Sequence, residues 1–180
     1  MRPIIPCLWF DNQAIEATKF YATVFKDAKV LQVTHYGQHQ PGPENGVMTV
    51  RFRMNGQEFL FLNGGPHFKF TEAVSFVVHC KTQKKLDKTY ARLIADGGSE
   101  VQCGWVTDKF GLSWQVVPAK LDKLANDRDP DRRDRVMHAL LKMQKLDIAA
   151  LEQAAEGQPS GDAAPAPAPK RGNARQRQRK

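Results

Sequence analysis

The sequence has too few cysteines, in the wrong arrangement, for a disulfide framework or a zinc knuckle. Its 180 residues include three, Cys7, Cys80 and Cys103, an odd number without CxxC spacing. No N-terminal segment combines a basic start, an apolar run and a small-residue cleavage site, and the apolar run 4–10 is too short for a membrane span. We therefore expect a reduced, cytoplasmic protein without a membrane segment.

The sequence also lacks the glycine-rich turn of a Rossmann-type cofactor site. That turn stands between a strand and a helix, with an acidic residue about twenty positions further on. Gly64-Gly65 is the nearest candidate, but it lies between a hairpin and a Pro-containing connector where no helix is expected. We therefore expect no cofactor of this kind.

Outside the C-terminus, the chain has little excess of positive charge. The formal net charge is +8, but residues 170–180 carry six lysines and arginines and no acid, which leaves +2 for residues 1–169. Basic residues interleaved with Gln, Asn and Gly can contact phosphates non-specifically. Without aromatic residues among them, they are not expected to read sequence. We expect either weak polyanion contact through this tail or a solvated tail without a partner.

A β-hairpin at residues 48–63 is the clearest element. Apolar residues alternate with polar ones from Met48 to Met54, which is typical of a half-buried strand. Asn55-Gly56 then favours a type I′ turn, and the chain returns as a strand from Glu58 to Leu62. The other elements are expected to lie at the edges or on one face of this sheet.

The remaining elements repeat the same order twice. Further strands are expected at 4–10, 30–36, 73–80, 100–106 and 112–118. Each half contains one helix with an apolar stripe on one face. The stripes are Ala17, Phe20, Tyr21 and Val24, and then Leu86, Tyr90, Leu93 and Ile94. The expected N-caps are Asp11 or Asn12 for the first helix and Thr82 for the second.

This repeat predicts an α+β fold with paired βαβββ modules forming a cup-shaped curved sheet. A shift of 69 residues superposes Tyr21 on Tyr90. The modules are expected at 4–63 and 73–118, within a domain of residues 1–120. A helical extension is expected at 121–156, with one helix starting at Asp129-Pro130 and another after Asp147. The Ala/Pro-rich, basic tail at 157–180 is expected to be disordered.

Several stretches resemble the PhnB-like branch of the vicinal oxygen chelate (VOC) superfamily, which includes glyoxalases and bleomycin-resistance proteins. They are PCLWFDNQAIEATKFY, NGQEFLFLNGGPHFKF, AVSFVVHC, KMQKLDIAALEQA and, most specifically, CGWVTDKFGLSWQVVP. Members often carry the name 3-demethylubiquinone-9 3-methyltransferase. The resemblance covers about residues 3–156 and implies a cup-shaped site and a homodimer. Without a Rossmann-type turn, methyl transfer is not expected.

The resemblance also gives positions for a divalent metal, which enzymes of this superfamily hold with His and Glu from four strands. Those positions correspond here to Pro6, a residue near Phe61, Ser75 and Gln115. Proline and phenylalanine side chains cannot ligate, and neutral Ser and Gln bind such ions weakly. His79, on the Ser75 face, is interpreted as a polar residue at a strand end. We therefore expect no metal.

A cup without metal can still bind a small molecule. Matching Gln115 to the family position places Ser113, Gln115 and Val117 towards the cup and Trp114 against a helix. The expected ligand-binding residues are Ser75, Cys103, Trp105, Gln115, Phe68 and Phe70. The alternative is that the aromatic residues belong to the core and a dimer interface.

Cys103 has no nearby cationic residue in sequence to lower its pKa and is expected to be an inert thiol. Asp108-Lys109 is expected to form a turn with a local ion pair and no acid–base role. The leading hypothesis is therefore metal-independent small-molecule binding, with catalysis and reaction unassigned. The alternatives are a divalent-metal lyase or dioxygenase-like enzyme, and an interaction protein tethered to a polyanion by residues 170–180.

Overall fold

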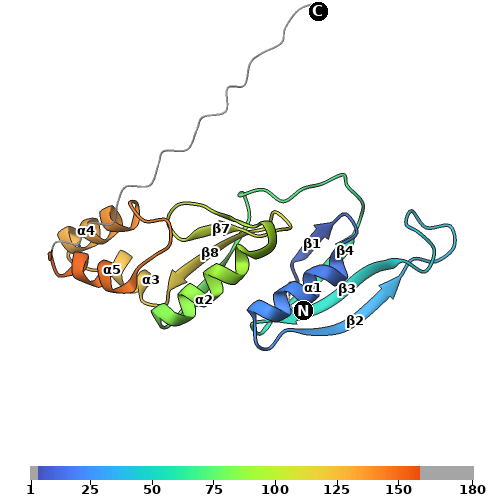
Figure 1. Cartoon of the computed structure of the whole chain (residues 1–180), viewed down its shortest axis with the longest axis horizontal. Helices are drawn as coiled ribbons and strands as arrows, with labels where there is room; N and C mark the ends of the chain where they lie inside the picture. The colour runs from blue at the N-terminus through green and yellow to red at the C-terminus, as the bar shows by residue number, and fades with distance from the viewer. Residues whose placement is uncertain (1–3, 159–180) are drawn as a thin grey trace, which may run out of the picture.

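Two βαβββ modules followed by three helices make up the computed structural model, which describes residues 4–158 (Figure 1). The first module comprises β1 (Cys7–Phe10), α1 (Ala14–Val24), β2 (Lys29–His35), β3 (Val47–Met54) and β4 (Gln57–Asn63). The second comprises β5 (Ser75–Cys80), α2 (Gln83–Leu93), the 3-10 turn η1 (Ala95–Gly97), β6 (Ser99–Glu100), β7 (Trp105–Thr107) and β8 (Ser113–Pro118). Then come α3 (Leu121–Ala125), α4 (Pro130–Leu140) and α5 (Ile148–Ala155).

Both sheets have the same topology. The strand orders are β1-β4-β3-β2 and β5-β8-β7-β6. In each sheet the first strand pairs in parallel with the last, and the other pairs are antiparallel. The 69-residue shift carries the bounds of α1 onto those of α2, and Tyr21 and Tyr90 are both buried. The predicted α+β fold with paired modules is confirmed.

The hairpin forms as predicted. Asn55 has φ +50° and Gly56 φ +79°, the two positive values that a type I′ turn requires. The carboxylate of Asp27 holds this turn from outside, because its two oxygens accept hydrogen bonds from the backbone N–H groups of Asn55 and Gly56, each at 2.7 Å.

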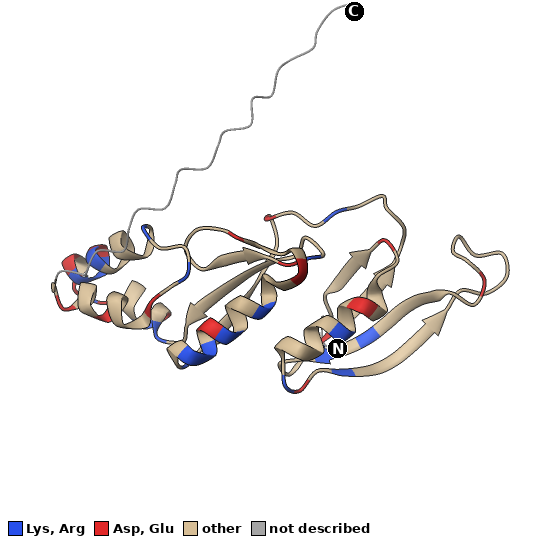
Figure 2. Cartoon of the chain, viewed as in Figure 1, with Lys and Arg blue, Asp and Glu red and all other residues tan. Residues whose placement is uncertain are grey.

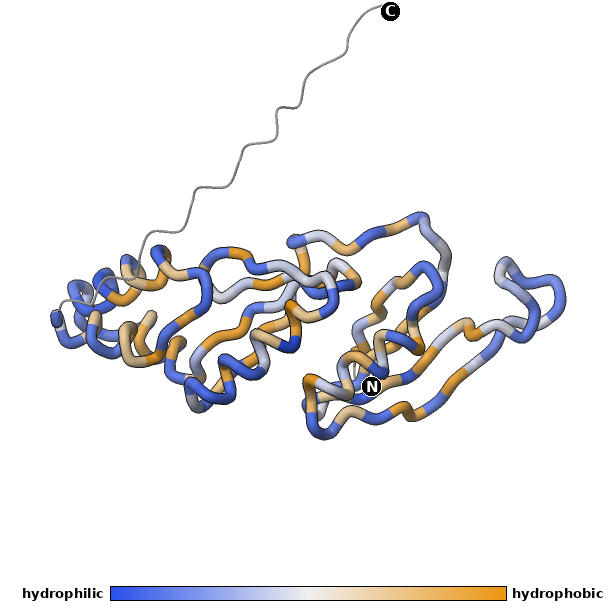
Figure 3. Tube along the Cα trace, in the orientation of Figure 1, coloured by the Kyte–Doolittle hydropathy of each residue, from blue (hydrophilic) through white to orange (hydrophobic). Residues whose placement is uncertain are grey.

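The core lies between each sheet and its helix and continues across the contact between the modules. The predicted stripe of α1 is buried, and in α2 only Ile94, just past the helix end, is partly exposed. The modules lie side by side along the long axis of the molecule (Figure 1). Hydrophobic residues recur along strands and helices, whereas the loop between β2 and β3 is mainly hydrophilic (Figure 3). No helix within residues 4–158 is long and apolar enough to cross a membrane.

The predicted cap of α1 is wrong. Neither Asp11 nor Asn12 caps the helix; the N-cap position is Gln13, whose side chain makes no capping bond. The Ala14 N–H instead donates to Oδ1 of Asn63, at the end of β4, at 2.9 Å. A helix start can therefore be satisfied by a residue 49 positions away, which local sequence rules do not consider.

The single strand predicted at 100–106 is also wrong. The chain breaks into β6 and β7 because Cys103 and Gly104 have φ +61° and +81°, outside the β region. Their N–H groups donate to the carbonyls of Met143 and Gln144, so this turn contacts the segment between α4 and α5.

The C-terminal helices begin as predicted. Asp129 accepts a hydrogen bond from the N–H of Asp131, and Asp147 accepts one from Ala150. The apolar side expected for α4 is only partly buried, since Met137 and Leu141 are 37% and 56% exposed. Gln158 is the last described residue, so nearly all of the predicted tail, including 170–180, lies outside the described part of the chain.

Candidate functional site

Three of the expected binding residues come together on the face of the second sheet turned away from α2, here called the open face. The amide Nε2 of Gln115 on β8 donates to Oγ of Ser75 on β5 at 2.9 Å. Trp105 on β7 is the cross-strand partner of Gln115. All three side chains are half-buried, so a polar pair whose amide oxygen has no hydrogen-bond partner within residues 4–158 lies beside an aromatic ring that solvent can reach.

Strand alternation produces this face. Trp114, next to Gln115 on β8, points the other way and packs against Tyr21 of α1 with ring centroids 5.5 Å apart. Trp114 therefore lies against a helix as expected, and Gln115 faces outward.

Cys103 lies in the turn between β6 and β7. Its side chain is half-buried, and burial raises the pKa of its thiol, which keeps it protonated near neutral pH. This agrees with an inert thiol at the contact with the C-terminal helices.

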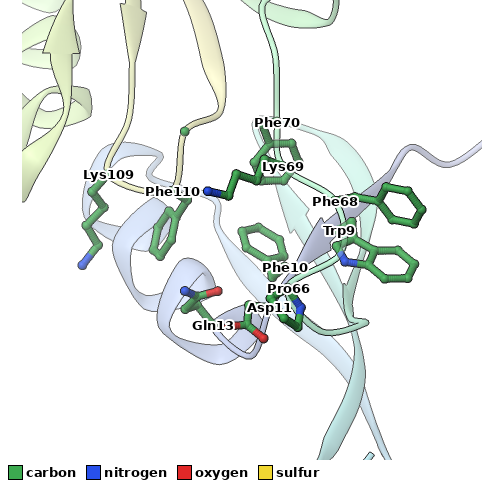
Figure 4. A pocket seen from close by; sticks show the side chains of 11 residues that line it. Trp9, Phe10, Asp11, Gln13, Pro66, Phe68, Lys69, Phe70, Lys109 and Phe110 are labelled. Carbon is green, nitrogen blue, oxygen red and sulfur yellow. The ribbon is translucent and has the colours of Figure 1, made fainter. Parts of the chain in front are cut away.

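Phe68 and Phe70 belong to a different hollow, at the seam between the two modules. This aromatic pocket has a volume of about 440 Å³ and is lined by the end of β1, the connector after β4 and the turn 109–111 (Figure 4). Phe68 meets the ring of Trp9 edge-on with centroids 4.9 Å apart, and Phe70 meets Phe10 at 5.4 Å. Ser75, Cys103, Trp105 and Gln115 are not among its lining residues.

Two backbone features hold the Trp9 ring in place. Its indole Nε1 donates to the carbonyl of Gly65 at 2.8 Å. A Cβ on Gly64 would lie 2.2 Å from the same ring, so only glycine permits this approach. Gly64-Gly65 therefore positions the Trp9 ring, and no helix begins directly after it.

Charge at the pocket is mixed, because Lys69, Lys109 and Asp11 line it together with Gln13. The predicted ion pair between Asp108 and Lys109 is wrong. Lys109 Nζ instead lies 2.5 Å from Oε1 of Glu16 and 5.2 Å from the centroid of the Phe110 ring. In Figure 4 the Lys109 side chain points away from the other labelled residues, whereas Lys69 points towards Phe110.

Asp108 has a structural environment. Oδ2 accepts hydrogen bonds from Tyr21 OH and Trp114 Nε1, both at 2.8 Å, and Oδ1 accepts from the N–H groups of Phe110 and Leu112. Burial raises the pKa of this carboxyl group, while the four donors act in the opposite direction. Asp108 thus joins α1 of one module to the last strand of the other, away from any solvent-exposed surface.

The metal positions implied by the resemblance include a residue near Phe61 on β4. Phe61 is fully buried on the α1 side of its sheet, with its ring 5.9 Å from that of Tyr21. Its neighbours on the opposite face are Leu60 and Leu62, which have no ligating atoms. Nε2 of His79 lies 3.4 Å from Oδ2 of Asp122. Within residues 4–158, no three His, Cys, Asp or Glu side chains gather as a metal site would require.

Sequence reasoning missed part of the aromatic pocket. Trp9, Phe10 and Phe110 line it, but only Phe68 and Phe70 were expected at a site. Alternation along β1 could have suggested that Trp9 faces away from the buried Leu8. Phe110 could not be placed without knowing how the modules pack. A neighbouring hollow of about 700 Å³ shares Asp11 and Pro66 and extends towards Tyr36.

Comparison with known proteins assigns the family. The model of the 3-demethylubiquinone-9 3-methyltransferase family matches residues 2–117, so α3, α4 and α5 lie beyond the match. The PhnB protein from Bacillus cereus is 31% identical, with a TM-score of 0.58 over 64% of this chain and 99% of its own. None of the curated protein sequences matches this chain.

Two less similar structures support the fold alone. Protein PA1353 from Pseudomonas aeruginosa is 19% identical, covers 66% of this chain and 97% of its own, and has a TM-score of 0.52. The fosfomycin resistance protein FosX from Mesorhizobium loti is 11% identical, covers 69% and 98%, and has a TM-score of 0.51. The chain belongs to the 3-demethylubiquinone-9 3-methyltransferase-like family, the PhnB-like branch of the VOC superfamily.

Proposed function

We propose that this protein binds a small molecule on the open face of its second sheet, without a metal ion, as a homodimer. The observation that carries the proposal is the Gln115–Ser75 pair beside Trp105. A hydroxyl and an amide can orient a neutral polar group, while the indole ring supplies apolar contact area, as in many small-molecule sites. Cys103, Phe68 and Phe70, which were also expected at the site, are not included in this proposal, because Phe68 and Phe70 line a separate pocket and Cys103 lies against the segment between α4 and α5.

The donor set supports metal-independent binding. A divalent transition metal favours imidazole, thiolate or carboxylate ligands. Ser75 and Gln115 supply a hydroxyl and an amide, whereas Pro6 and the residues around Phe61, including Leu60 and Leu62, supply no ligating side-chain atom. Elemental analysis of the purified protein tests this point. Less than a tenth of an equivalent of Zn, Fe, Mn or Ni per chain is expected, and about one equivalent would favour the lyase or dioxygenase-like enzyme.

Exposed apolar side chains beside the site support the homodimer. Val77, on the same face as Gln115, is 47% exposed, and Val74, just before β5, is 62% exposed. Apolar area of this kind next to a polar anchor is typical of a surface that a second chain covers. The mass in solution tests this proposal, because a monomer would contradict it.

Methyl transfer is not proposed, although the family name refers to it. Gly64-Gly65 holds the Trp9 ring, and the connector after it leads directly to β5 without a helix. A methyl-donating nucleotide bound in the Rossmann manner would need a helix N-terminus at this place.

A ligand screen by thermal shift tests the proposed site. A ligand that raises the melting temperature of the wild type is expected to lose this effect with Gln115→Ala or Trp105→Ala, because stabilisation by a ligand follows its affinity. Gln57→Ala, the same change at the exposed start of β4, is the matched control and should keep the full shift. Equal shifts in all three variants would place the ligand elsewhere.

A further inference from the structure

The exposed side of α2 carries a concentration of positive charge that the near-neutral average of residues 1–169 conceals. Lys85, Lys88 and Arg92 follow one another at spacings of three and four residues, which places them in one row along the helix, and Lys81 lies just before the helix start. Lys84 lies beside this row, and Lys26 adds a cation from the turn after α1. We define these six residues as the basic face; Figure 2 shows the blue segments along α2.

Within the described part of the chain, no acidic side chain forms an ion pair with this face. All six residues are exposed, and none forms an ion pair with any residue in 4–158. The one acid within α2 is Asp87, which accepts from Gln83 Nε2 and lies 2.8 Å from Lys145 Nζ. Its charge is therefore engaged with the C-terminal helices.

The arrangement is unfavourable for the helix itself. Lysines separated by four residues, such as Lys84 and Lys88, repel each other. Lys84 and Lys85 also occupy the first turn, where the helix dipole favours acids, and this turn contains none. A bound polyanion would relieve both kinds of repulsion.

The face is also hollowed. A depression of about 230 Å³ lies between the end of α1 and α2, with Val24 and Thr89 in its walls and five cations of the basic face around it. Cations from two elements therefore surround one concave surface. The solvated side of a single helix is convex and would carry cations from that helix alone.

We propose that the basic face binds the phosphate backbone of double-stranded nucleic acid, independently of the small-molecule site. A row of cations along a straight helix of about 16 Å can follow successive phosphates. No aromatic side chain lines the depression, so stacking on unpaired bases is not available. The large apolar residues of α2 are buried, whereas a helix that lies in a membrane surface exposes them.

The test compares two full-length triple variants with the same loss of charge. Lys84→Gln/Lys85→Gln/Lys88→Gln removes half of the basic face. Lys29→Gln/Lys123→Gln/Lys142→Gln removes three exposed lysines that lie off it. Both keep residues 159–180, so any contribution of the basic tail is the same in each.

Binding to a labelled 20-base-pair DNA duplex is measured by anisotropy between 50 and 200 mM salt. The affinity at 50 mM salt exceeds that at 200 mM salt, and the ratio of the two grows with the number of phosphate contacts. The loss of three contacts should reduce this ratio by about 40-fold. This loss is expected for the α2 variant, with little change in the control. Equal losses in the two variants, or no measurable duplex binding by the wild type, would overturn the proposal.

Two further measurements keep the result interpretable. The α2 variant should melt no lower than the wild type, because the substitution removes repulsion, so a loss of binding cannot be ascribed to unfolding. Its thermal shift with a ligand of the small-molecule site should also be unchanged, which separates the two proposals. Selective loss of binding to phosphatidylserine vesicles, with duplex binding retained, would favour a membrane surface and overturn the proposal.

Discussion

At the scale of single residues, Asp108 shows how a polar side chain can join two modules. Its two oxygens accept four hydrogen bonds from both sides of the contact. The sequence suggests only a turn here, because Asp-Lys before Phe-Gly is typical of an exposed bend. The tertiary partner Tyr21, 87 positions away, determines the environment instead.

Asp108→Asn is expected to lower the free energy of unfolding by about 2 kcal/mol, because an amide NH₂ would face a donor, either Trp114 Nε1 or a backbone N–H, in a buried place. Chemical denaturation followed by Trp fluorescence measures the loss. Asp134→Asn, on the exposed side of α4, is the control and should change stability by less than about 0.5 kcal/mol. Equal effects at the two positions would show that the network contributes little.

At the scale of elements, sequence patterns correctly predict those turns and helix ends that neighbouring residues determine. The hairpin turn follows from Asn55-Gly56, and the α2 start follows from Thr82, whose hydroxyl accepts from the N–H of Lys85. The patterns fail where a distant partner intervenes. Asn63 caps α1 from β4, and the break between β6 and β7 faces backbone carbonyls of the C-terminal segment. No rule based on neighbouring residues could have found either.

The same reasoning applies to the candidate site. Alternation along β8 was enough to place Gln115 and Trp114 on opposite faces, and the structure has them so. The aromatic pocket needed the packing of the two modules, since Phe10 and Phe110 come from opposite sides of the seam. Residue types can therefore indicate a site on one sheet more readily than a site between two.

Asp27 gives the hairpin a dependence on pH. Slight desolvation raises the pKa of its carboxyl group, but hydrogen bonds from the N–H groups of Asn55 and Gly56 outweigh this and lower the pKa overall. A lowered pKa in the folded state stabilises the protein above the ordinary Asp value, and this stabilisation is lost as the pH falls through the folded-state value.

Asp27→Asn should therefore destabilise the protein at pH 7 by about 1 kcal/mol, the usual contribution of one lost hydrogen bond. The difference from wild type should shrink as the pH is lowered towards 3, which denaturant titrations at several pH values would measure. A difference that stays constant from pH 7 to pH 3 would contradict the role assigned to the charged carboxylate.

At the scale of the whole molecule, the C-terminal helices are tied to the second module by both polar and apolar contacts. The side-chain amide of Gln83, at the start of α2, donates to the carbonyl of Leu146 and accepts from the N–H of Ile148. Leu146 is fully buried and lies against Gly104, where a Cβ would come within 3.0 Å of the Leu146 side chain and 2.9 Å of the Val116 carbonyl oxygen. These contacts support the inference that residues 121–155 unfold together with the modules.

Leu146→Ala should accordingly lower the free energy of unfolding by about 2–5 kcal/mol, the cost of a cavity in a core. Trp9, Trp105 and Trp114 all lie in the modules, so their fluorescence reports module unfolding, whereas far-UV circular dichroism also includes α4 and α5. Both signals should shift together along one denaturant curve. Leu141→Ala, at a side chain 56% exposed on the same segment, should cost less than about 1 kcal/mol. If dichroism falls before fluorescence, or if the two leucines are equally tolerant, the extension folds as a separate unit and the second module does not depend on it.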